Sequence, residues 1–444
     1  MKKEVYFIGI GGIGMSALAR YFLSEGFKVS GSDISPSIIT KGLKKDGVTI
    51  HIGQNDPKYI KKDFSFIIYN PAIPKNNPEL KKAKKLGIAC KLYAEALGDL
   101  TRKYKTIAIA GSHGKSTTTA MTSLMLVKAG LDPTVIVGTK LKEFNDTNFR
   151  KGKSNLLVIE ADEFNGSFWN HSPFISVINN IDKEHLDFYK NFSNIKKSFI
   201  KFIKNTDNKG FVVYNDFDGN LKKLIKSLII KPKTIPYSKN KKMLSKLKKI
   251  LKVPGNHNLY NALAAYNVGK ILKITDKKIL NGLSKYQGSW RRMEYRGIIK
   301  LSPKKTPIMV YDDYGHHPTE IAATLSAFRQ KWPKNRLICV FQPHQISRLK
   351  SHFSGFKKVL KAADKALILP AYKVAGRDIK MASKYSAETL AKGIGGVYIK
   401  DPTDFKNLLR KVVYDYPPSS KIILVMMGAG NIIDYSDKLI HSKL

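Results

Sequence analysis

A glycine loop followed by a lysine and a hydroxyl residue carries the clearest chemical signal in this chain. Residues 107–120 read IAIAGSHGKSTTTA, an apolar run that breaks into the loop and continues as a helix start. In such a turn the backbone N–H groups cradle phosphate oxygens, Lys115 reaches the β- and γ-phosphates, and the Ser116 hydroxyl can bind Mg2+. The usual motif has a glycine where this chain has Ile109, so a tight strand-to-helix turn is the alternative. The residues that we assign to a nucleoside triphosphate are Gly111, Ser112, His113, Gly114, Lys115, Ser116 and Thr117.

A second glycine motif lies near the N-terminus. Gly9, Gly11 and Gly14 form G-x-G-x-x-G after the first apolar run, Gly12 lies within it, and Asp33 ends the next run. Such glycines let the backbone approach a diphosphate at a helix N-terminus, while the carboxylate accepts hydrogen bonds from sugar hydroxyls. The chemistry requires only a diphosphate, so NAD and a UDP-sugar both satisfy it, and a glycine turn without a ligand is the third interpretation.

Acidic and histidine side chains follow two further apolar runs. They come after LLVIEAD and within INNIDKEHLDF, and they are Glu160, Asp162, Glu163, Asp182, Glu184, His185 and Asp187. The carboxyl ends of parallel strands meet at one edge of a sheet, where ligands bind. Carboxylates at that edge can hold Mg2+ or its waters beside the phosphate loop. Two successive strand ends of this kind favour a metal-phosphate site over an acidic surface turn.

Four more polar segments lie in the second half of the chain. PGNHNLYNALAA places Asn258 and Asn261 on one face of a helix start, where they cap the helix or meet a nucleotide base. Arg291 and Arg292 are either a surface pair or a source of a guanidinium for a transferring phosphoryl group. Two more strand ends, in DDYGHHPTE and FQPHQISR, carry Asp313, Tyr314, His316, His317, His344 and Arg348.

The elements that must position these residues alternate between strand and helix in three blocks. Each block begins with an apolar run of strand character, which is typical of parallel, doubly wound α/β sheets. We therefore predict an α/β protein of three domains, at 1–104, 105–288 and 289–444.

The chain is strongly basic, with 78 Lys and Arg against 34 Asp and Glu and a net charge of +44. Such a charge favours anionic partners. The basic residues are spread along the chain without interleaved aromatics, so we expect solvated helix faces and neither nucleic acid nor membrane as a partner.

Cys90 and Cys339 lack metal-ligand spacing, and no apolar stretch approaches the length of a membrane span. We expect a cytoplasmic monomer or weak dimer with reduced thiols.

The order of these motifs resembles that of the Mur ligases of peptidoglycan synthesis. The resemblance spans nearly the whole chain: GIGGIGMSALA, GSHGKSTTT, EADE, NIDKEHLDFY, GNHNLYNALAA, RRMEYRG, DDYGHHPTE, FQPH and GAGN. It implies a Rossmann-like N-terminal domain for the UDP portion, a central P-loop ATPase-like domain, and a Rossmann-like C-terminal domain that closes over ATP and the amino acid. Within the family it is closest to the ligase that joins L-alanine to the lactyl carboxylate of UDP-N-acetylmuramate through an acyl phosphate, with ATP and Mg2+.

The resemblance also implies roles for individual residues. Lys115 would handle the γ-phosphate, Ser116 the metal, and Glu160 and His185 would hold Mg2+. The positions that would lie near the nucleotide or complete the ATP site are Asn258, Asn261, Arg292 and Asp313. Those that would line the muramate and alanine end are Tyr314, His316, His344 and Arg348.

The chain departs from the family pattern at three places. Ser112 and Ser116 replace threonines, which keeps the hydroxyl, and ADEFNGSF replaces ADESDASF, which removes an acidic side chain. Gln345 stands where the family has an arginine, and an amide does not replace a bidentate guanidinium facing a carboxylate. Arg377, in YKVAGRD, is the candidate that would compensate.

Three rival functions remain open from the sequence. A related ligase would add a preformed peptide to UDP-muramate, although FQPH and GIGGIGMSALA favour the alanine enzyme. An NAD-dependent dehydrogenase would use the first glycine motif but leaves the phosphate loop and Glu160 without a role. A nucleic-acid-binding NTPase would explain the charge, and its ATP turnover would rise with added polynucleotide.

Overall fold

The computed structural model describes residues 3–301, 307–372 and 383–441. Arg377 lies outside these ranges, and the side chain of Asp187 is not described. The chain forms two compact units. The first consists of residues 1–251 and 259–286, and the second of residues 252–258 and 287–444.

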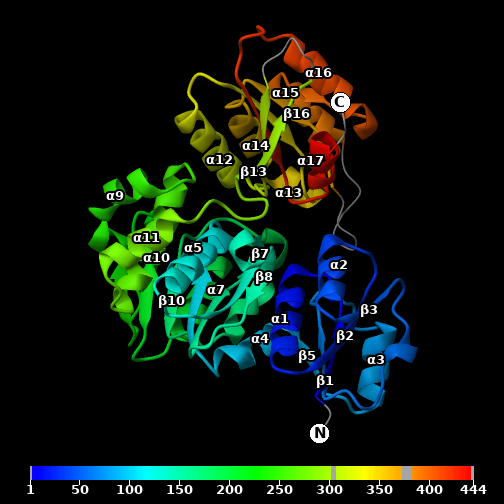
Figure 1. Cartoon of the computed structure of the whole chain (residues 1–444), viewed down its shortest axis with the longest axis vertical. Coiled ribbons are helices and arrows are strands. Elements are labelled where there is room, and N and C mark those ends of the chain that lie inside the picture. Colours follow the sequence, from blue (N-terminus) through cyan, green and yellow to red (C-terminus); the bar gives the residue numbers. More distant parts are fainter. Residues whose placement is uncertain (1–2, 302–306, 373–382, 442–444) are drawn as a thin grey trace. The chain divides into compact units, whose positions relative to one another are not determined.

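The first unit contains two sheets, and the N-terminal one is a five-stranded parallel sheet of order β3-β2-β1-β4-β5 (Figure 1). Its strands are β1 (Glu4–Ile8), β2 (Lys28–Asp33), β3 (Thr49–Ile52), β4 (Phe66–Tyr69) and β5 (Cys90–Leu92). Its helices are α1 (Ile13–Ser24), α2 (Ile38–Lys45), α3 (Pro78–Lys85) and α4 (Tyr93–Thr101). The strand order reverses between β1 and β4, and this switch point is where open α/β sheets bind ligands.

The central sheet of the first unit has seven strands in the order β12-β11-β10-β6-β9-β7-β8. They are β6 (Lys105–Ala110), β7 (Thr134–Leu141), β8 (Thr147–Arg150), β9 (Leu156–Glu160), β10 (Ile175–Ile178), β11 (Phe211–Tyr214) and β12 (Lys233–Pro236). The helices are α5 (Lys115–Lys128), α6 (Leu186–Tyr189), α7 (Phe192–Lys204), α8 (Gly219–Lys226), α9 (Met243–Ile250), α10 (Asn256–Ile271) and α11 (Asp276–Ser284). β6 is buried from its second residue onward, as expected of a central parallel strand. Only β8 runs antiparallel, against β7.

The second unit is built on a six-stranded sheet of order β13-β14-β18-β15-β16-β17. Its strands are β13 (Glu294–Ile299), β14 (Ile308–Asp313), β15 (Arg336–Phe341), β16 (Lys365–Ile368), β17 (Val397–Tyr398) and β18 (Ile422–Met427). Its helices are α12 (Pro318–Lys331), α13 (Ile346–Ser351), α14 (Phe353–Leu360), α15 (Ala387–Ile394), α16 (Phe405–Tyr414) and α17 (Ile432–His441). Alternate residues of the central strands enter two separate hydrophobic clusters, because successive side chains point to opposite faces.

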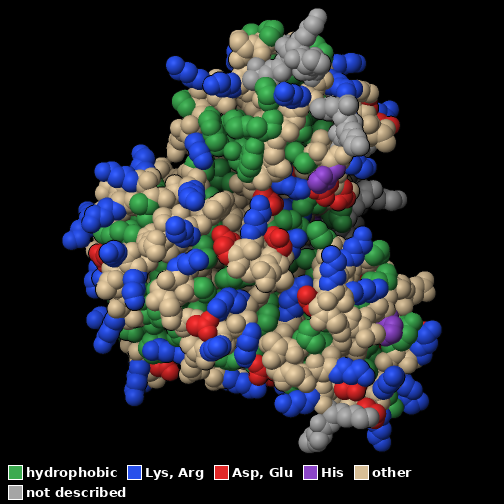
Figure 2. All heavy atoms as spheres, viewed as in Figure 1, with side chains coloured by type: hydrophobic (Ala, Val, Ile, Leu, Met, Phe, Trp, Pro, Cys, Tyr) green, Lys and Arg blue, Asp and Glu red, His purple; other side chains and the backbone are tan. Residues whose placement is uncertain are grey.

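The α/β class with parallel-rich sheets is therefore confirmed. The antiparallel edge strands β8 and β13 were not expected from the sequence, because neither TNFR nor EYRGII is a buried apolar run. Lys and Arg side chains are scattered over the face seen in Figure 2. Within the described ranges, none of the helices combines the length and apolar character needed to cross a membrane.

Candidate functional site

The phosphate loop connects β6 to α5 and has the geometry that its glycines predict. Gly111 has φ 138° and Gly114, which precedes the helix, has φ 80°, a region that favours glycine. The loop is fixed to the segment after β10, where Asn180 Oδ1 accepts a hydrogen bond of 2.8 Å from the N–H of His113. The N-terminus of α5 therefore presents backbone N–H groups and the positive end of its dipole at this loop.

Lys115 is the first residue of α5, and its side chain reaches back to the carbonyl groups of the loop and is only 13% exposed. Its Nζ donates to the carbonyl oxygen of Gly111 at 2.9 Å and to Oε2 of Glu163 at 2.7 Å. Burial lowers the pKa of Lys115, but the negative charges of Glu163, Asp162 and Glu160 outweigh it and raise the pKa above its usual value. Lys115 is therefore a permanent cation at neutral pH.

Ser116 and Glu160, predicted to share a metal, lie next to one another. The Ser116 hydroxyl donates to Glu160 Oε1 at 3.0 Å, and the Gly138 N–H donates to Glu160 Oε2 at 2.8 Å. Gly138 lies where the pairing of β7 with β8 is irregular, and a Cβ at this position would be 2.5 Å from Glu160 Oε2. Gly138 was missed from the sequence because only the fold brings β7 beside the end of β9.

His185, assigned to the metal by the resemblance, lies beside the carboxylate of Glu163. Its Nε2 is 3.7 Å from Glu163 Oε1, and one ligand atom each of Asp162, Glu163 and His185 lie within 4.8 Å of one another. The backbone of His185 has φ 54°, an uncommon conformation for a residue with a side chain. That Glu160 and His185 hold the Mg2+ ions stays a prediction.

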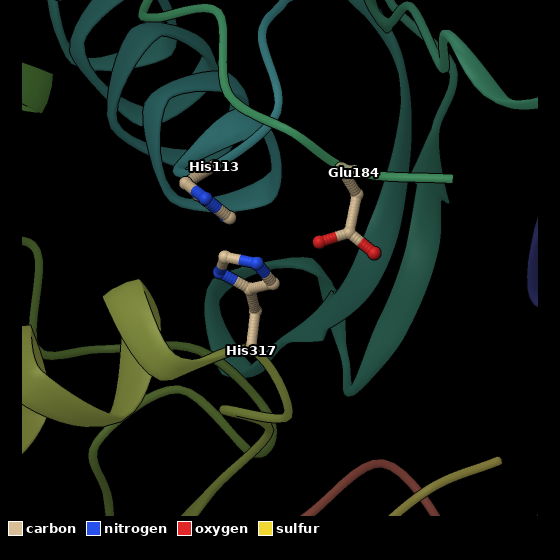
Figure 3. A group of neighbouring side chains, drawn as sticks. All are labelled: His113, Glu184 and His317. Atoms are coloured by element: carbon tan, nitrogen blue, oxygen red, sulfur yellow. The ribbon is translucent and has the colours of Figure 1, made fainter. Parts of the chain in front are cut away.

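The residues that follow β10 pack against the phosphate loop. His113 Nε2 lies 2.9 Å from Asp182 Oδ2, and ligand atoms of His113 and Glu184 are within 4.8 Å (Figure 3). His317, also drawn in Figure 3, belongs to the second unit, where it precedes α12. Asn179 donates to Thr118 Oγ1 at 3.0 Å and, like Asn180, was missed, although the motif INNID contains both.

The N-terminal glycine turn lies at the switch point between β1 and β4. The Gly11 N–H donates to Asp33 Oδ2 at 2.7 Å, so the predicted carboxylate touches the predicted turn. A Cβ on Gly12 would be 2.8 Å from Asn70 Nδ2, and a Cβ on Gly14 would be 2.6 Å from the Tyr93 hydroxyl oxygen. Asn70 follows β4 and was not identified from the sequence, because its role depends on strand order.

Tyr93 connects this turn to the acidic residues of the central sheet. Burial raises its pKa, and the charges of Glu160 and Asp162 raise it further. The glycine turn and the carboxylates of the phosphate site are therefore electrostatically close within the first unit.

In the second unit, the structure distinguishes the two adjacent arginines. Arg291 donates through Nη2 to the carbonyl oxygens of Gly428 and Gly430, at 2.5 and 2.8 Å, and is 6% exposed. The side chain of Arg292 is 25% exposed, lies 4.8 Å over the Tyr314 ring, and has Nη1 3.5 Å from Glu320. Arg291 is a structural residue, whereas Arg292 is more accessible to a ligand.

Asp313 holds the chain segments around Arg292 in place. Its carboxylate accepts hydrogen bonds from the N–H groups of Met293 and Gly315 at 2.9 and 2.8 Å, and from the Thr324 hydroxyl at 3.3 Å. Burial raises the pKa of Asp313, and the charge of Arg292 opposes this shift. The predicted pair Arg292 and Asp313 therefore belongs to one local arrangement.

The residues predicted for the amino-acid end form a continuous row. The centroid of the His316 ring is 5.3 Å from that of Tyr314 and 6.1 Å from that of His344. Arg348 Nη1 lies 3.3 Å from His344 Nδ1. His344 also stacks on Tyr372, which the sequence did not reveal, with centroids 5.5 Å apart.

Gln345, which replaces the arginine of the family, has an unusual backbone. Its φ is 68° and its ψ is 128°, and its N–H donates to the Tyr372 carbonyl oxygen at 3.1 Å. Residues in sparsely populated conformations often lie at functional sites.

The two asparagines of α10 belong to different units. Asn258 donates to the Pro254 carbonyl oxygen at 2.7 Å, within the segment 252–258 that begins α10 and belongs to the second unit. Asn261 lies in the first unit at the phosphate loop, where its Oδ1 would be 2.7 Å from a Cβ on Gly114. Asn261 is therefore the member of the pair that borders the phosphate loop within its own unit.

A phosphate loop on a parallel sheet, an adjacent hydroxyl-carboxylate pair and two further α/β sheets in the same chain are features of nucleotide-dependent enzymes, and the chain belongs to the Mur ligase family. It matches the Mur ligase family catalytic domain over residues 4–105, the Mur ligase middle domain over 109–269, and the Mur ligase glutamate ligase domain over 291–430. The family predicted from the motif order is thus confirmed.

The chain is also similar to individual proteins over nearly their full length. The chain is 38% identical to the UDP-N-acetylmuramate–L-alanine ligase of Aquifex aeolicus, covering 99% of this chain and 97% of the relative. It is 37% identical to the enzyme of the same name from Clostridium kluyveri, with coverage of 98% and 97%. The crystal structure of UDP-N-acetylmuramate-alanine ligase from Thermotoga maritima superposes with a TM-score of 0.78 at 26% identity, over 98% of each chain.

Proposed function

We propose that this protein is an ATP-dependent ligase that joins L-alanine to the lactyl carboxylate of UDP-N-acetylmuramate, a step in the synthesis of peptidoglycan precursors. The named relatives support this substrate pair. The observation that carries the proposal is the phosphate loop itself, in which Lys115 and the Ser116–Glu160 pair lie side by side. Neither a dehydrogenase nor a passive UDP-sugar binder needs that arrangement.

The chemistry requires activation of the carboxylate, because a carboxylate and a free amine do not condense in water. A lactyl carboxylate oxygen attacks the γ-phosphorus of ATP, ADP leaves, and an acyl phosphate forms. The amine of alanine then attacks the acyl carbon, and inorganic phosphate leaves with the original carboxylate oxygen. The amine gives up its proton as the amide forms.

Lys115 contributes a fixed positive charge to this reaction. It is held at the loop by Gly111 and Glu163, beside the N-terminus of α5 where the phosphates would bind. Preorganised charge directed at a transferring phosphoryl group is usually the largest catalytic contribution. Arg292, from the second unit, would add a further guanidinium.

A divalent cation fits the residues present. Ser116 Oγ and Glu160 Oε1 are neighbouring hard oxygen donors, the ligand type that Mg2+ prefers. Ser116 and Glu160 would hold it, and by family resemblance His185 would also serve the Mg2+ ions. When bound, the ion would neutralise charge on the triphosphate.

The nucleotide sugar would occupy the N-terminal switch point. The turn at Gly9, Gly11, Gly12 and Gly14 would face the diphosphate, with Asp33 and Asn70 on either side. The row Tyr314, His316, His344 and Arg348 would serve the muramate and alanine end. Since ATP and UDP-sugars are cytoplasmic metabolites, we place the enzyme in the cytoplasm.

Phosphate release from ATP, measured with UDP-N-acetylmuramate and scanned over amino acids, tests this proposal. We expect release that requires both the sugar nucleotide and L-alanine. Release with a preformed peptide but not with alanine would assign the chain to the peptide-adding ligases. Phosphate release that does not depend on UDP-N-acetylmuramate but increases when polynucleotide is added would overturn the proposal.

A further inference from the structure

The Tyr93 hydroxyl lies against the glycine turn of the N-terminal sheet, yet it forms no hydrogen bond with any residue that the structure describes. Tyr93 is the first residue of α4. A Cβ on Gly14 would be 2.6 Å from the hydroxyl oxygen and 2.7 Å from the ring carbon that carries it, so glycine at this position leaves room for the tyrosine. The side chain is partly exposed, and its O–H group is therefore available to a ligand.

The charges around Tyr93 keep this hydroxyl protonated. Burial raises its pKa, and the negative charges of Glu160 and Asp162 raise it further. A protonated phenol donates one hydrogen bond, and such a bond is strongest when the acceptor is an anionic oxygen. Tyr93 is therefore suited to a carboxylate or phosphate oxygen of a ligand.

Tyr93 is close to both of the sites that the proposed reaction has to connect. On one side, Gly14 lies in the first turn of α1, whose N-terminus would hold the diphosphate of the sugar nucleotide. On the other side, Glu160 accepts the hydrogen bond of Ser116 at the phosphate loop, where the γ-phosphate would bind. The lactyl carboxylate must extend from the first site toward the second before it can attack the γ-phosphorus. Its approach to Glu160 and Asp162 also brings like charges together, so a donor on this route would stabilise it.

We propose that Tyr93 binds the lactyl carboxylate of the sugar nucleotide by donating its O–H to one carboxylate oxygen, which leaves the other oxygen for attack on the γ-phosphorus. This inference rests on the proposed function, and it adds a residue of the N-terminal sheet to the site of the acceptor substrate. It also gives the protein a means to prefer a sugar that carries the lactyl ether over the same sugar without it. A Tyr93 ring that only packs against Gly14 is the alternative.

Tyr93→Phe separates these two roles, because it removes the hydroxyl and keeps the ring. None of the described residues loses a hydrogen bond, so the variant should unfold at the wild-type denaturant midpoint. Calorimetry compares three ligands: UDP-N-acetylmuramate, UDP-N-acetylglucosamine, which has a hydroxyl in place of the lactyl ether, and UDP. The affinity for UDP-N-acetylmuramate should fall about ten- to a hundredfold, as expected for the loss of one hydrogen bond to a charged group. The affinities for the other two ligands should not change.

Tyr104→Phe is the matched control, because it also removes one tyrosine hydroxyl from the first unit. Tyr104 precedes β6, whereas the phosphate loop follows that strand, so Tyr104 lies at the opposite edge of the central sheet. This variant should bind all three ligands as the wild type does. In steady-state kinetics, Tyr93→Phe alone should raise the KM for UDP-N-acetylmuramate and leave the KM for ATP unchanged.

The possible results separate this inference from the proposed function. A wild-type protein that binds none of the three ligands contradicts the proposed function and with it this inference. If the wild-type protein binds UDP-N-acetylmuramate, an unchanged affinity of Tyr93→Phe for this ligand overturns the inference alone. An equal loss of affinity for all three ligands also overturns it, because the hydroxyl would then serve the diphosphate or the fold.

Discussion

The Ser116 hydroxyl donates a 3.0 Å hydrogen bond to Oε1 of Glu160, a residue that lies at the end of a neighbouring strand. The two residues are far apart in sequence, but β6 and β9 are paired in parallel, so the start of α5 and the end of β9 meet at one sheet edge. This edge is where the strands, the phosphate loop and the proposed metal site come together.

Replacement of Lys115 should abolish ligation. Lys115→Ala removes the cation to which we assign the transferring phosphoryl group, and it leaves Glu163 buried without its partner. We expect loss of product formation and a free energy of unfolding lower by about 3 kcal/mol, from denaturant titration. Lys128→Ala, on the exposed end of the same helix, should retain activity. Near-wild-type turnover of Lys115→Ala would contradict the assignment.

Glu160→Gln should change the metal dependence of the reaction. An amide is a poorer ligand for a hard cation than a carboxylate, so we expect a higher Mg2+ concentration for half-maximal rate, or loss of activity. The rate should be measured over a Mg2+ titration at saturating ATP. If the titration curve does not move, Glu160 is not a metal ligand.

Gly138→Ala should displace Glu160 without touching its charge. The added Cβ would lie 2.5 Å from Glu160 Oε2, so the carboxylate must shift. We expect a Mg2+ dependence altered in the same direction as in Glu160→Gln. Gly219→Ala is the control, since a Cβ there meets no atom within 4 Å among the described residues. Equal behaviour of the two alanine variants would show that the position of Glu160 is unimportant.

Asp312 should make the stability of the second unit depend on pH. Burial raises its pKa to about 6, although Ser436 and Arg296 oppose the shift. A carboxyl whose pKa is raised on folding stabilises the protein below its unfolded value near 3.8, and that contribution is lost as the pH rises to about 6. The wild-type free energy of unfolding should therefore fall relative to that of Asp312→Asn between these pH values, by at most about 3 kcal/mol. A difference that is constant with pH would refute the shift.

Gln345 and Arg377 should together determine the affinity for alanine. Arg377 lies outside the described residues, so its role is a prediction from the sequence alone. If it contacts the amino-acid carboxylate, Arg377→Ala should raise the KM for alanine about ten- to a hundredfold and leave the KM for ATP unchanged. Gln345→Arg should restore part of the loss. An Arg377→Ala enzyme with wild-type alanine KM would leave Arg348 as the candidate.

The sequence allowed prediction of those features that local patterns encode. The apolar run of β6, its glycine loop and the lysine-serine pair predicted the start of α5, and the structure begins that helix at Lys115. The glycine turn and Asp33 were likewise predicted, since both lie in one βαβ unit. Local propensity and motif spacing suffice in such cases.

The site contacts that could not be predicted from the sequence depend on the pairing of strands that are distant in the chain. Gly138 donates to Glu160 only because β7 pairs with β9, and Asn70 meets Gly12 only because β4 lies beside β1. His185 lies beside Glu163 through a turn with a positive φ that no sequence pattern predicts. Strand order and backbone strain are properties of the complete fold.

The fate of one oxygen atom tests the central claim most directly. UDP-N-acetylmuramate labelled with a heavy oxygen isotope in its lactyl carboxylate should be incubated with ATP and L-alanine, and the released phosphate analysed by mass spectrometry. An acyl-phosphate ligase transfers one carboxylate oxygen to phosphate, so we expect labelled phosphate in equal amount to the alanyl product. Alanyl product accompanied by unlabelled phosphate, or phosphate release without any amide product, would contradict the account.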